Sequence, residues 1–198
     1  SEMITIILET LDKLLEYTDV KDTVYIAIDG VAPQAKMKQQ RQRRHRSVQE
    51  EKVWDTNAIS PGTTFMKSLN VSLREWMDKI NLEDISYKVI LSDSEEPGEG
   101  EHKILHYLKT TKTTHQGPEA STVIYGLDAD LIMLGLVSEL PNVSLLRERT
   151  EYNIEDTDSE YVYLKIDPLK QFILQDIGIE SKIDDSCVIK DYIFICFL

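Results

Sequence analysis

TVIYGLDADLIMLGL, residues 122–136, decides the fold. A β-prone run, a turn with glycine and two aspartates, and a run of apolar residues follow one another here. This order predicts a buried strand, a tight turn and a buried helix. Two other apolar runs, VYIAIDG at 24–30 and KVILSD at 88–93, predict strands that also contain or end in aspartate. Strands followed by helices in this way are typical of an α/β fold.

The remaining segments complete this pattern. Residues 3–17 and 65–80 place apolar side chains three and four positions apart, which predicts amphipathic helices. HKILHYLK at 102–109 predicts a further helix. Two more strands are predicted at 142–148 (NVSLLRE) and 161–166 (YVYLKI), with loops at 54–62, 110–121 and 150–160. We therefore expect an α/β fold with a mostly parallel central sheet flanked by helices.

The charge of the chain is uneven. The 198 residues carry 35 acidic against 22 Lys and Arg side chains, a net charge of −13. Residues 36–46 nevertheless read KMKQQRQRRHR, which is strongly basic and holds no acid. At physiological salt a patch of this kind acts over about 8 Å, so it can bind an anion despite the acidic body. The contrast predicts that phosphate is handled next to carboxylates.

Composition also bears on the compartment. The chain is 41% apolar and 29% charged, as in globular proteins, and no apolar run reaches the ~20 residues that span a bilayer. No secretory signal begins the sequence. Cys187 and Cys196 are too few for a disulfide framework, and we expect both in the core of the last helix. We expect an intracellular protein without a membrane partner; cytoplasmic, nuclear and viral origins stay open.

Aspartates at strand ends predict a metal site. Asp29, Asp93 and Asp128 follow three predicted strands, whose carboxyl ends form the ligand crevice of open α/β sheets. Carboxylates that meet there raise one another's pKa unless a cation lies among them, and Mg²⁺ prefers such oxygen ligands. A single aspartate at a strand end more often caps a helix. Three in register, with Asp130 two residues beyond Asp128, favour the metal.

The segment PGEGEHK, residues 97–103, adds Glu99 and Glu101. Acids are stabilised in the first turn of a helix by its dipole, which is the structural alternative. Two glycines interleaved with them are unfavourable in a helix, and we interpret Gly98 and Gly100 as leaving room for a bulky ligand.

The basic segment has one face suited to phosphate. Gln, Arg, Lys and Met dominate this segment and favour helices, so we expect it to be helical. On that helix, Lys36, Gln40, Arg43 and Arg44 fall at i, i+4, i+7 and i+8, presenting an ammonium, an amide and two guanidinium groups. The alternative is a generic basic tail or localisation signal. The four histidines form no zinc-type cluster with the cysteines.

These residues together resemble a known family. AIDGVAPQAKMKQQRQRRHRS, SDSEEPGEGEHKI and YGLDADLIMLGL are similar to three signature blocks of Xrn-type 5′→3′ exoribonucleases, in the same order, and SPGTTFM and SLLRE resemble shorter landmarks. The resemblance runs from about Val24 to the end of the chain. It implies a PIN-like, flap-endonuclease-like fold and processive, Mg²⁺- or Mn²⁺-dependent hydrolysis of single-stranded RNA bearing a 5′ monophosphate to mononucleotides.

The resemblance also assigns residues. Asp29, Glu99, Glu101, Asp128 and Asp130 match the acids that hold two metal ions, and Lys36, Gln40, Arg43 and Arg44 match the pocket for the 5′ phosphate. Two further family aspartates fall outside residues 1–198. We therefore expect a single partial catalytic domain, truncated at both ends and inactive alone, a view that the uncapped apolar end YIFICFL supports.

Two other functions stay open at this stage. One is a non-catalytic RNA-binding scaffold, which would have no reason to keep five acids. The other is a phosphotransferase with Asp128 as nucleophile, which would favour a hydroxyl residue where this chain has Ile132.

Overall fold

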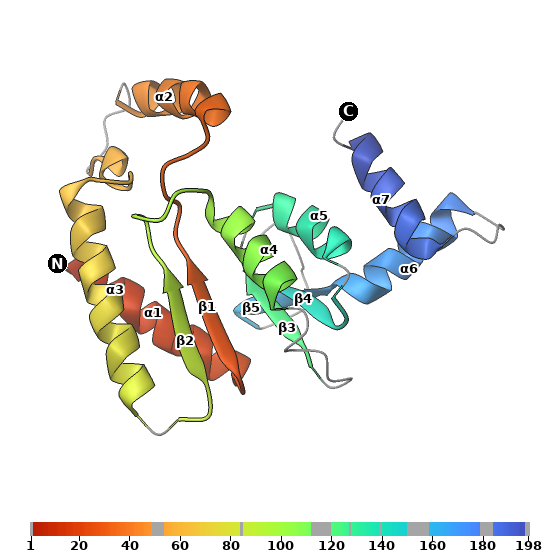
Figure 1. The fold of residues 1–198 in the computed structure, drawn as a ribbon, viewed down its shortest axis with the longest axis horizontal. Helices are drawn as coiled ribbons and strands as arrows, with labels where there is room; N and C mark the ends of the chain where they lie inside the picture. The colour runs from red at the N-terminus through yellow and green to blue at the C-terminus, as the bar shows by residue number, and fades with distance from the viewer. Residues whose placement is uncertain are drawn as a thin grey trace. The chain divides into compact units, whose positions relative to one another are not determined.

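The computed structural model describes residues 2–48, 54–83, 85–111, 120–126, 128–138, 140–149, 159–178 and 184–196. These residues belong to two compact units, residues 1–104 and residues 105–198, which we call the first and the second unit. Figure 1 labels the helices and strands of both. None of the helices in the described segments combines the length and the apolar character needed to cross a bilayer.

The first unit is built on a parallel pair of strands. β1 (Thr23–Ala27) pairs with β2 (Lys88–Ser92), and Ala27 opposite Ser92 is the last pair of the ladder. The helices α1 (Glu2–Thr18) and α3 (Thr64–Leu82) share one apolar core with these strands. Its buried members are Ile4, Met66, Leu69 and Leu73. Burial of each such side chain stabilises the fold by about 1.5–3 kcal/mol, which explains the apolar stripes in the sequence.

Three more elements complete the first unit. The basic helix α2 (Gln34–Val48) follows β1 after a short loop. A single 3₁₀ turn, η1 (Thr56–Ala58), precedes α3, whose first turn is capped by the hydroxyl of Thr63. The helix α4 (Gly100–Thr110) begins in the first unit a few residues after β2.

The second unit contains a three-stranded sheet. β3 (Thr122–Tyr125) and β4 (Val143–Glu148) are parallel and are joined through α5 (Asp130–Val137), a β-α-β connection. β5 (Tyr161–Lys165) lies antiparallel to β4. The helices α6 (Ile166–Ile177) and α7 (Asp185–Cys196) follow. Leu146 and Ile166 are completely buried at the centre of this unit.

The predicted α/β fold with parallel strands and flanking helices is confirmed. Every predicted helix and strand is present within a few residues of its expected bounds. The pairing places the strands in two sheets and makes β5 antiparallel. The prediction of one partial catalytic domain is not tested by this division. Most of the predicted loops at 110–121 and 150–160 lies outside the described residues.

Two expectations from the sequence need correction. Helix α6 was not predicted, although Pro168 in its first turn and Gly178 after its last residue are ordinary helix signals. The expectation that both cysteines lie in the core is wrong, because Cys187 and Cys196 are exposed. The buried residues of α7 are Val188, Ile189 and Ile193, and Cys196 ends the helix beyond them.

Candidate active site

Two loops of the first unit are joined through their backbones at the ends of β1 and β2. The N–H of Ile28 donates to the carbonyl of Ser92 at 2.9 Å, and the N–H of Gly30 donates to the carbonyl of Gly98 at 2.8 Å. In return the N–H of Gly98 donates to the carbonyl of Val31 at 3.1 Å. Residues 28–31 and 92–98 therefore run together, although more than 60 residues separate them in the sequence.

Glycines make this close approach feasible. A Cβ atom at Gly30 would overlap the carbonyl oxygen of Glu96, and one at Gly100 would lie 3.1 Å from the carbonyl oxygen of Ala27. Gly98 has a φ of +109°, a conformation that side chains with a Cβ rarely adopt. Room for a ligand is therefore not needed to explain Gly98 and Gly100. The backbone of this loop requires them.

Asp29 holds the start of α4. Its Oδ1 accepts a hydrogen bond of 2.6 Å from the N–H of Gly100, the first residue of that helix. A carboxylate in this place is stabilised by the unpaired N–H groups and the dipole of the helix. The capping role weighed for a single strand-end aspartate is thus present here, on α4 rather than on the next helix in the chain. The residue itself remains exposed to solvent.

Glu99 joins the acidic loop to the basic helix. Its side chain is only 10% exposed, and its Oε2 accepts a hydrogen bond of 2.7 Å from Nζ of Lys36 on α2. The Nδ1 atom of His102 lies 3.4 Å from the same oxygen. Glu101 lies half-buried in the first turn of α4. The predicted phosphate face and two predicted metal acids therefore occupy one region of the first unit.

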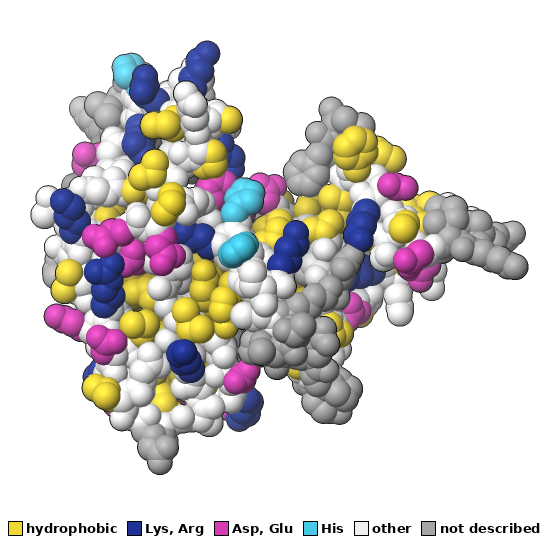
Figure 2. Space-filling model, in the orientation of Figure 1, with side chains coloured by type: hydrophobic (Ala, Val, Ile, Leu, Met, Phe, Trp, Pro, Cys, Tyr) yellow, Lys and Arg dark blue, Asp and Glu magenta, His cyan; other side chains and the backbone are white. Residues whose placement is uncertain are grey.

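The basic segment is helical, as predicted. Lys36, Gln40 and Arg44 follow one another along α2, and Nη2 of Arg44 lies 3.5 Å from Oε1 of Gln40. Arg43 belongs to the same helix, but its side chain is outside the described part of the structure. On the face seen in Figure 2, Lys and Arg side chains gather over α2. The described residues thus place an ammonium, an amide and a guanidinium group along one face of the helix.

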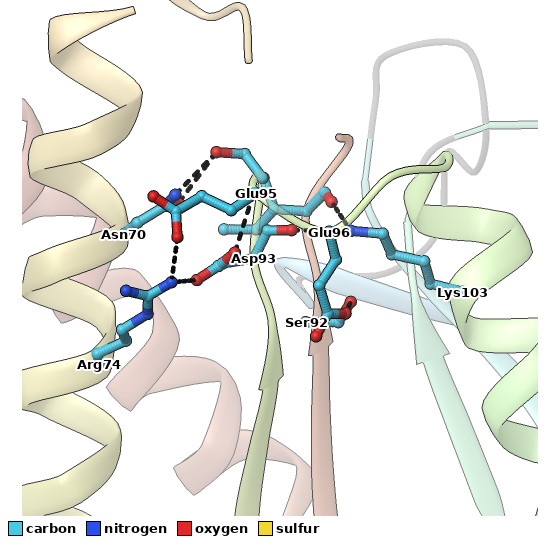
Figure 3. Close-up of polar contacts among 9 residues, drawn as sticks. Asn70, Arg74, Ser92, Asp93, Glu95, Glu96 and Lys103 are labelled. Carbon is cyan, nitrogen blue, oxygen red and sulfur yellow. Dashed lines mark hydrogen bonds and ion pairs between the residues drawn. The ribbon is translucent and has the colours of Figure 1, made fainter. Parts of the chain in front are cut away.

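Asp93 has a different role from the one expected at a strand end. Its carboxylate is nearly buried and forms an ion pair with Arg74 on α3, which also binds Oε2 of Glu95 at 2.7 Å (Figure 3). These contacts with Glu95 and Asp93 raise the pKa of the Arg74 guanidinium. The Oδ1 atom of Asp93 also accepts a hydrogen bond of 2.9 Å from the N–H of Glu95. Asp93 therefore fixes the loop after β2 to α3, and its counter-ion is already present.

Lys103, which the sequence analysis did not single out, lies beneath these loops. Its ammonium group donates to the carbonyl oxygens of Ile28 and Asp93, each at 2.8 Å. Burial lowers the pKa of this ammonium, and the nearby carboxylates of Glu96, Asp93 and Asp29 oppose that shift. The sequence did contain a signal for this role. The spacing of Gly100, Lys103 and Tyr107 places the lysine on the same side of α4 as a glycine and an aromatic residue, the side that is covered in the structure. A lysine on a buried stripe requires partners.

The second unit carries the remaining two acids. Asp128 and Asp130 are exposed and lie at the turn between β3 and α5, where the N–H of Leu131 donates to the carbonyl of Asp128 at 3.3 Å. Asp130 is the first residue of α5, whose preceding residue, Ala129, supplies no side-chain cap. This is the strand, turn and acidic helix start that the sequence predicted.

The donor chemistry of these acids fits a hard divalent cation, since all five are carboxylates. Within the described residues, however, no three or more Asp, Glu, His or Cys side chains are grouped so that they could hold a metal ion. In the first unit, Asp29 is bonded to a backbone N–H and Glu99 to Lys36. Assembly of the five carboxylates around metal stays a prediction.

Comparison with known families identifies the chain. Residues 1–53 and residues 47–149 match the family described as the XRN 5′-3′ exonuclease N-terminus. The chain belongs to this family. The α/β arrangement found above is accordingly the PIN-like nuclease fold of the XRN N-terminal domain, as the resemblance implied.

Curated relatives of the XRN chain carry the name 5′-3′ exoribonuclease 2. The protein from Kluyveromyces lactis is 32% identical over 99% of this chain, which covers 26% of that relative. The protein from Candida glabrata is 33% identical, with 99% of this chain and 25% of the relative covered. The protein from Emericella nidulans is 40% identical over 74% of this chain and 18% of the relative. The XRN chain thus spans about a quarter or less of the length of these relatives.

Proposed function

We propose that the protein to which this chain belongs is a 5′→3′ exoribonuclease. It degrades single-stranded RNA that carries a 5′ monophosphate, one nucleotide at a time and processively, to mononucleotides. Membership of the XRN family and the names of the relatives support the reaction class. An intracellular location, in the cytoplasm or the nucleus, belongs to the same proposal.

The observation that carries the proposal is the contact between Lys36 and Glu99. Nζ of Lys36 lies 2.7 Å from Oε2 of Glu99, so a helix rich in phosphate-binding groups adjoins a loop rich in carboxylates. An exonuclease that acts at an RNA end needs this neighbourhood. One group of side chains must bind the terminal phosphate, while another acts on a phosphodiester bond one nucleotide away.

Lys36, Gln40, Arg43 and Arg44 would bind the terminal phosphate. An ammonium, an amide and guanidinium groups donate the several charge-assisted hydrogen bonds that a doubly charged monophosphate accepts. A triphosphate or a cap adds bulk and charge beyond this set of donors. The face therefore selects RNA by the chemistry of its 5′ end.

Asp29, Glu99, Glu101, Asp128 and Asp130 would hold Mg²⁺ or Mn²⁺, as two ions. Such ions, when bound, supply charge stabilisation at a phosphodiester and lower the pKa of water. The chain itself contributes the carboxylates, the cap that Asp29 provides to α4 and the joined loops that keep Asp29 beside Gly100.

The test uses the full-length protein, because the chain spans about a quarter of its relatives. Two RNAs of identical sequence, one with a 5′ monophosphate and one with a 5′ triphosphate, are digested with Mg²⁺. We expect the monophosphate to be degraded about tenfold faster or more, given the discrimination that a polar site achieves. The 198-residue chain alone is expected to be inactive.

A variant pair sharpens this test. Arg44→Ala should reduce the preference for the monophosphate, whereas Arg41→Ala, an exposed arginine of the same helix on another face, should leave it unchanged. Equal rates on the two RNAs with the unaltered protein would contradict the selectivity. Absence of RNA degradation would contradict the proposed function itself.

A further inference from the structure

Lys103 is a buried lysine of the first unit. It belongs to α4, only 9% of its surface is exposed, and its ammonium donates to two backbone carbonyls (Figure 3). An ionised lysine is rarely buried to this extent unless it has fixed partners. The two acceptors, on Ile28 and Asp93, belong to different strand ends.

The position of these acceptors is informative. The parallel ladder of β1 and β2 ends with Ala27 opposite Ser92, so Ile28 and Asp93 are the first residues beyond it on each strand. Lys103 bonds both carbonyls at 2.8 Å. The ammonium therefore joins the two strand ends beside the backbone hydrogen bond that the N–H of Ile28 donates to the carbonyl of Ser92.

Helix α4 consequently binds two successive residues at the end of β1, Ile28 and Asp29. Lys103 binds the carbonyl of Ile28, and the N–H of Gly100, less than one turn earlier on the helix, binds the carboxylate of Asp29. Glu99 and Glu101 flank Gly100. The direction in which Asp29 presents its carboxylate relative to these glutamates is thus set by two bonds from α4.

The loop after β2 is also attached to α3, by contacts that do not involve Lys103. Arg74 binds Asp93 and Glu95, and Asn70, which is 1% exposed, exchanges hydrogen bonds with Ser94 (Figure 3). Those contacts attach the loop to α3. Lys103 instead attaches the β1 strand end, which carries Asp29, to α4.

We propose that Lys103 is a positioning residue of the acidic site, which holds Asp29 in register with Glu99 and Glu101 by clamping the ends of β1 and β2. This inference rests on the proposed function, because it gives those acids a shared task. A neutral side chain would remove the ammonium donor from the part-buried carbonyl of Ile28 and would leave the carbonyl of Asp93 with only the 3.3 Å hydrogen bond from the N–H of Glu96, which would free the backbone next to Asp29. Groups that orient metal ligands in this way typically affect metal affinity about 10–100-fold.

The experiment measures Mn²⁺ binding to the full-length protein by electron paramagnetic resonance, without RNA. Lys103→Met removes the donors, and Lys103→Gln keeps a shorter amide donor in case the first variant does not fold. Two controls accompany them. Lys109→Met removes an exposed lysine of the same helix, and Ile4→Ala loosens the core of the first unit without removing a hydrogen bond at the two strand ends.

We expect Mn²⁺ affinity to fall about tenfold or more in Lys103→Met and less in Lys103→Gln, in line with other residues that orient ligands. The turnover rate should fall with it, while KM for monophosphorylated RNA stays within about twofold, since α2 binds the phosphate. Ile4→Ala should lower the melting temperature without changing Mn²⁺ affinity.

Two outcomes separate the inferences. If a folded Lys103 variant binds Mn²⁺ as tightly as Ile4→Ala does, Lys103 serves stability only and the positioning role is overturned. If the unaltered protein binds Mn²⁺ but degrades no RNA, the proposed function fails, and the comparison of Mn²⁺ affinities still decides the role of Lys103.

Discussion

Nζ of Lys36 lies 2.7 Å from Oε2 of Glu99, and this ion pair joins α2 to the loop that precedes α4. Lys36 is half-exposed, whereas the Glu99 side chain is nine-tenths buried. The acid therefore has a cation beside it. A lysine assigned to phosphate and a glutamate assigned to metal are in direct contact, so the two binding functions are expected to influence each other.

Lys36→Met should tighten metal binding while it weakens binding of the RNA 5′ end. Removal of the ammonium takes away a positive charge that competes with the metal for Glu99. Because Lys36 is half-exposed, the gain should be modest, about two- to fivefold in Mn²⁺ affinity. Titration of the full-length protein by isothermal calorimetry measures it. Lys38→Met, an exposed lysine of the same helix, is the control. Weaker Mn²⁺ binding in Lys36→Met would contradict the competition.

Asp29→Asn should weaken metal binding, whereas Asp93→Asn should lower the stability of the fold. Asn at position 29 still accepts the hydrogen bond from Gly100, so stability should change little while Mn²⁺ affinity falls. Asn at position 93 weakens the ion pair with Arg74, and the free energy of unfolding should drop by about 1–2 kcal/mol with Mn²⁺ affinity retained. Urea denaturation and Mn²⁺ titration of both variants measure the contrast. If Asp93→Asn lost metal binding while Asp29→Asn kept it, Asp93 would be a metal ligand and the assignment of Asp29 would be wrong.

Gly30→Ala should destabilise the first unit strongly. The new Cβ would overlap the carbonyl oxygen of Glu96, and because that atom belongs to the backbone the joined loops must separate. We expect a loss of about 3 kcal/mol or more, the upper range for overpacking. The control is Gly98→Ala, where nothing lies within 4 Å and only the strain of φ +109° is added. Thermal unfolding compares them, and equal melting temperatures would be evidence against close packing at Gly30.

Asp128→Asn and Asp130→Asn should spare the fold and abolish RNA hydrolysis. Both residues are exposed at the turn before α5, so each change should alter stability by less than about 1 kcal/mol. As metal ligands they would be indispensable, and the rate should fall by about 100-fold or more. Single-turnover digestion of monophosphorylated RNA measures the rate, with circular dichroism as the check on folding. A variant that keeps the full rate would remove its residue from the proposed site.

Much of the fold could be predicted because it depends on local periodicity. The spacing of apolar residues at 3–17 and 65–80 led to α1 and α3, and the basic run at 36–46 led to α2. The face that carries Lys36, Gln40 and Arg44 could be drawn from helix geometry alone, since neighbours on a helix follow from sequence separation.

The partners of individual side chains could not be predicted in the same way. Lys103 bonds the carbonyl of Ile28, 75 residues away, and Arg74 bonds Asp93, 19 residues away. Backbone carbonyls leave no mark in the sequence, and nothing local distinguishes an aspartate that receives an arginine from one that does not. The burial of Cys187 was predicted wrongly for a related reason, because an apolar helix does not reveal which of its sides is covered.

The sequence by itself determined the order of all the helices and strands except α6, the basic face and the acids at strand ends, since each depends on residues close together in the chain. Only the tertiary structure decided that Gly30 packs against the backbone of Glu96, that Lys103 binds the carbonyls at two strand ends and that Lys36 contacts Glu99. Those relationships depend on how segments far apart in the chain pack against each other, and packing satisfies buried charges and backbone groups with whatever partner it brings within reach.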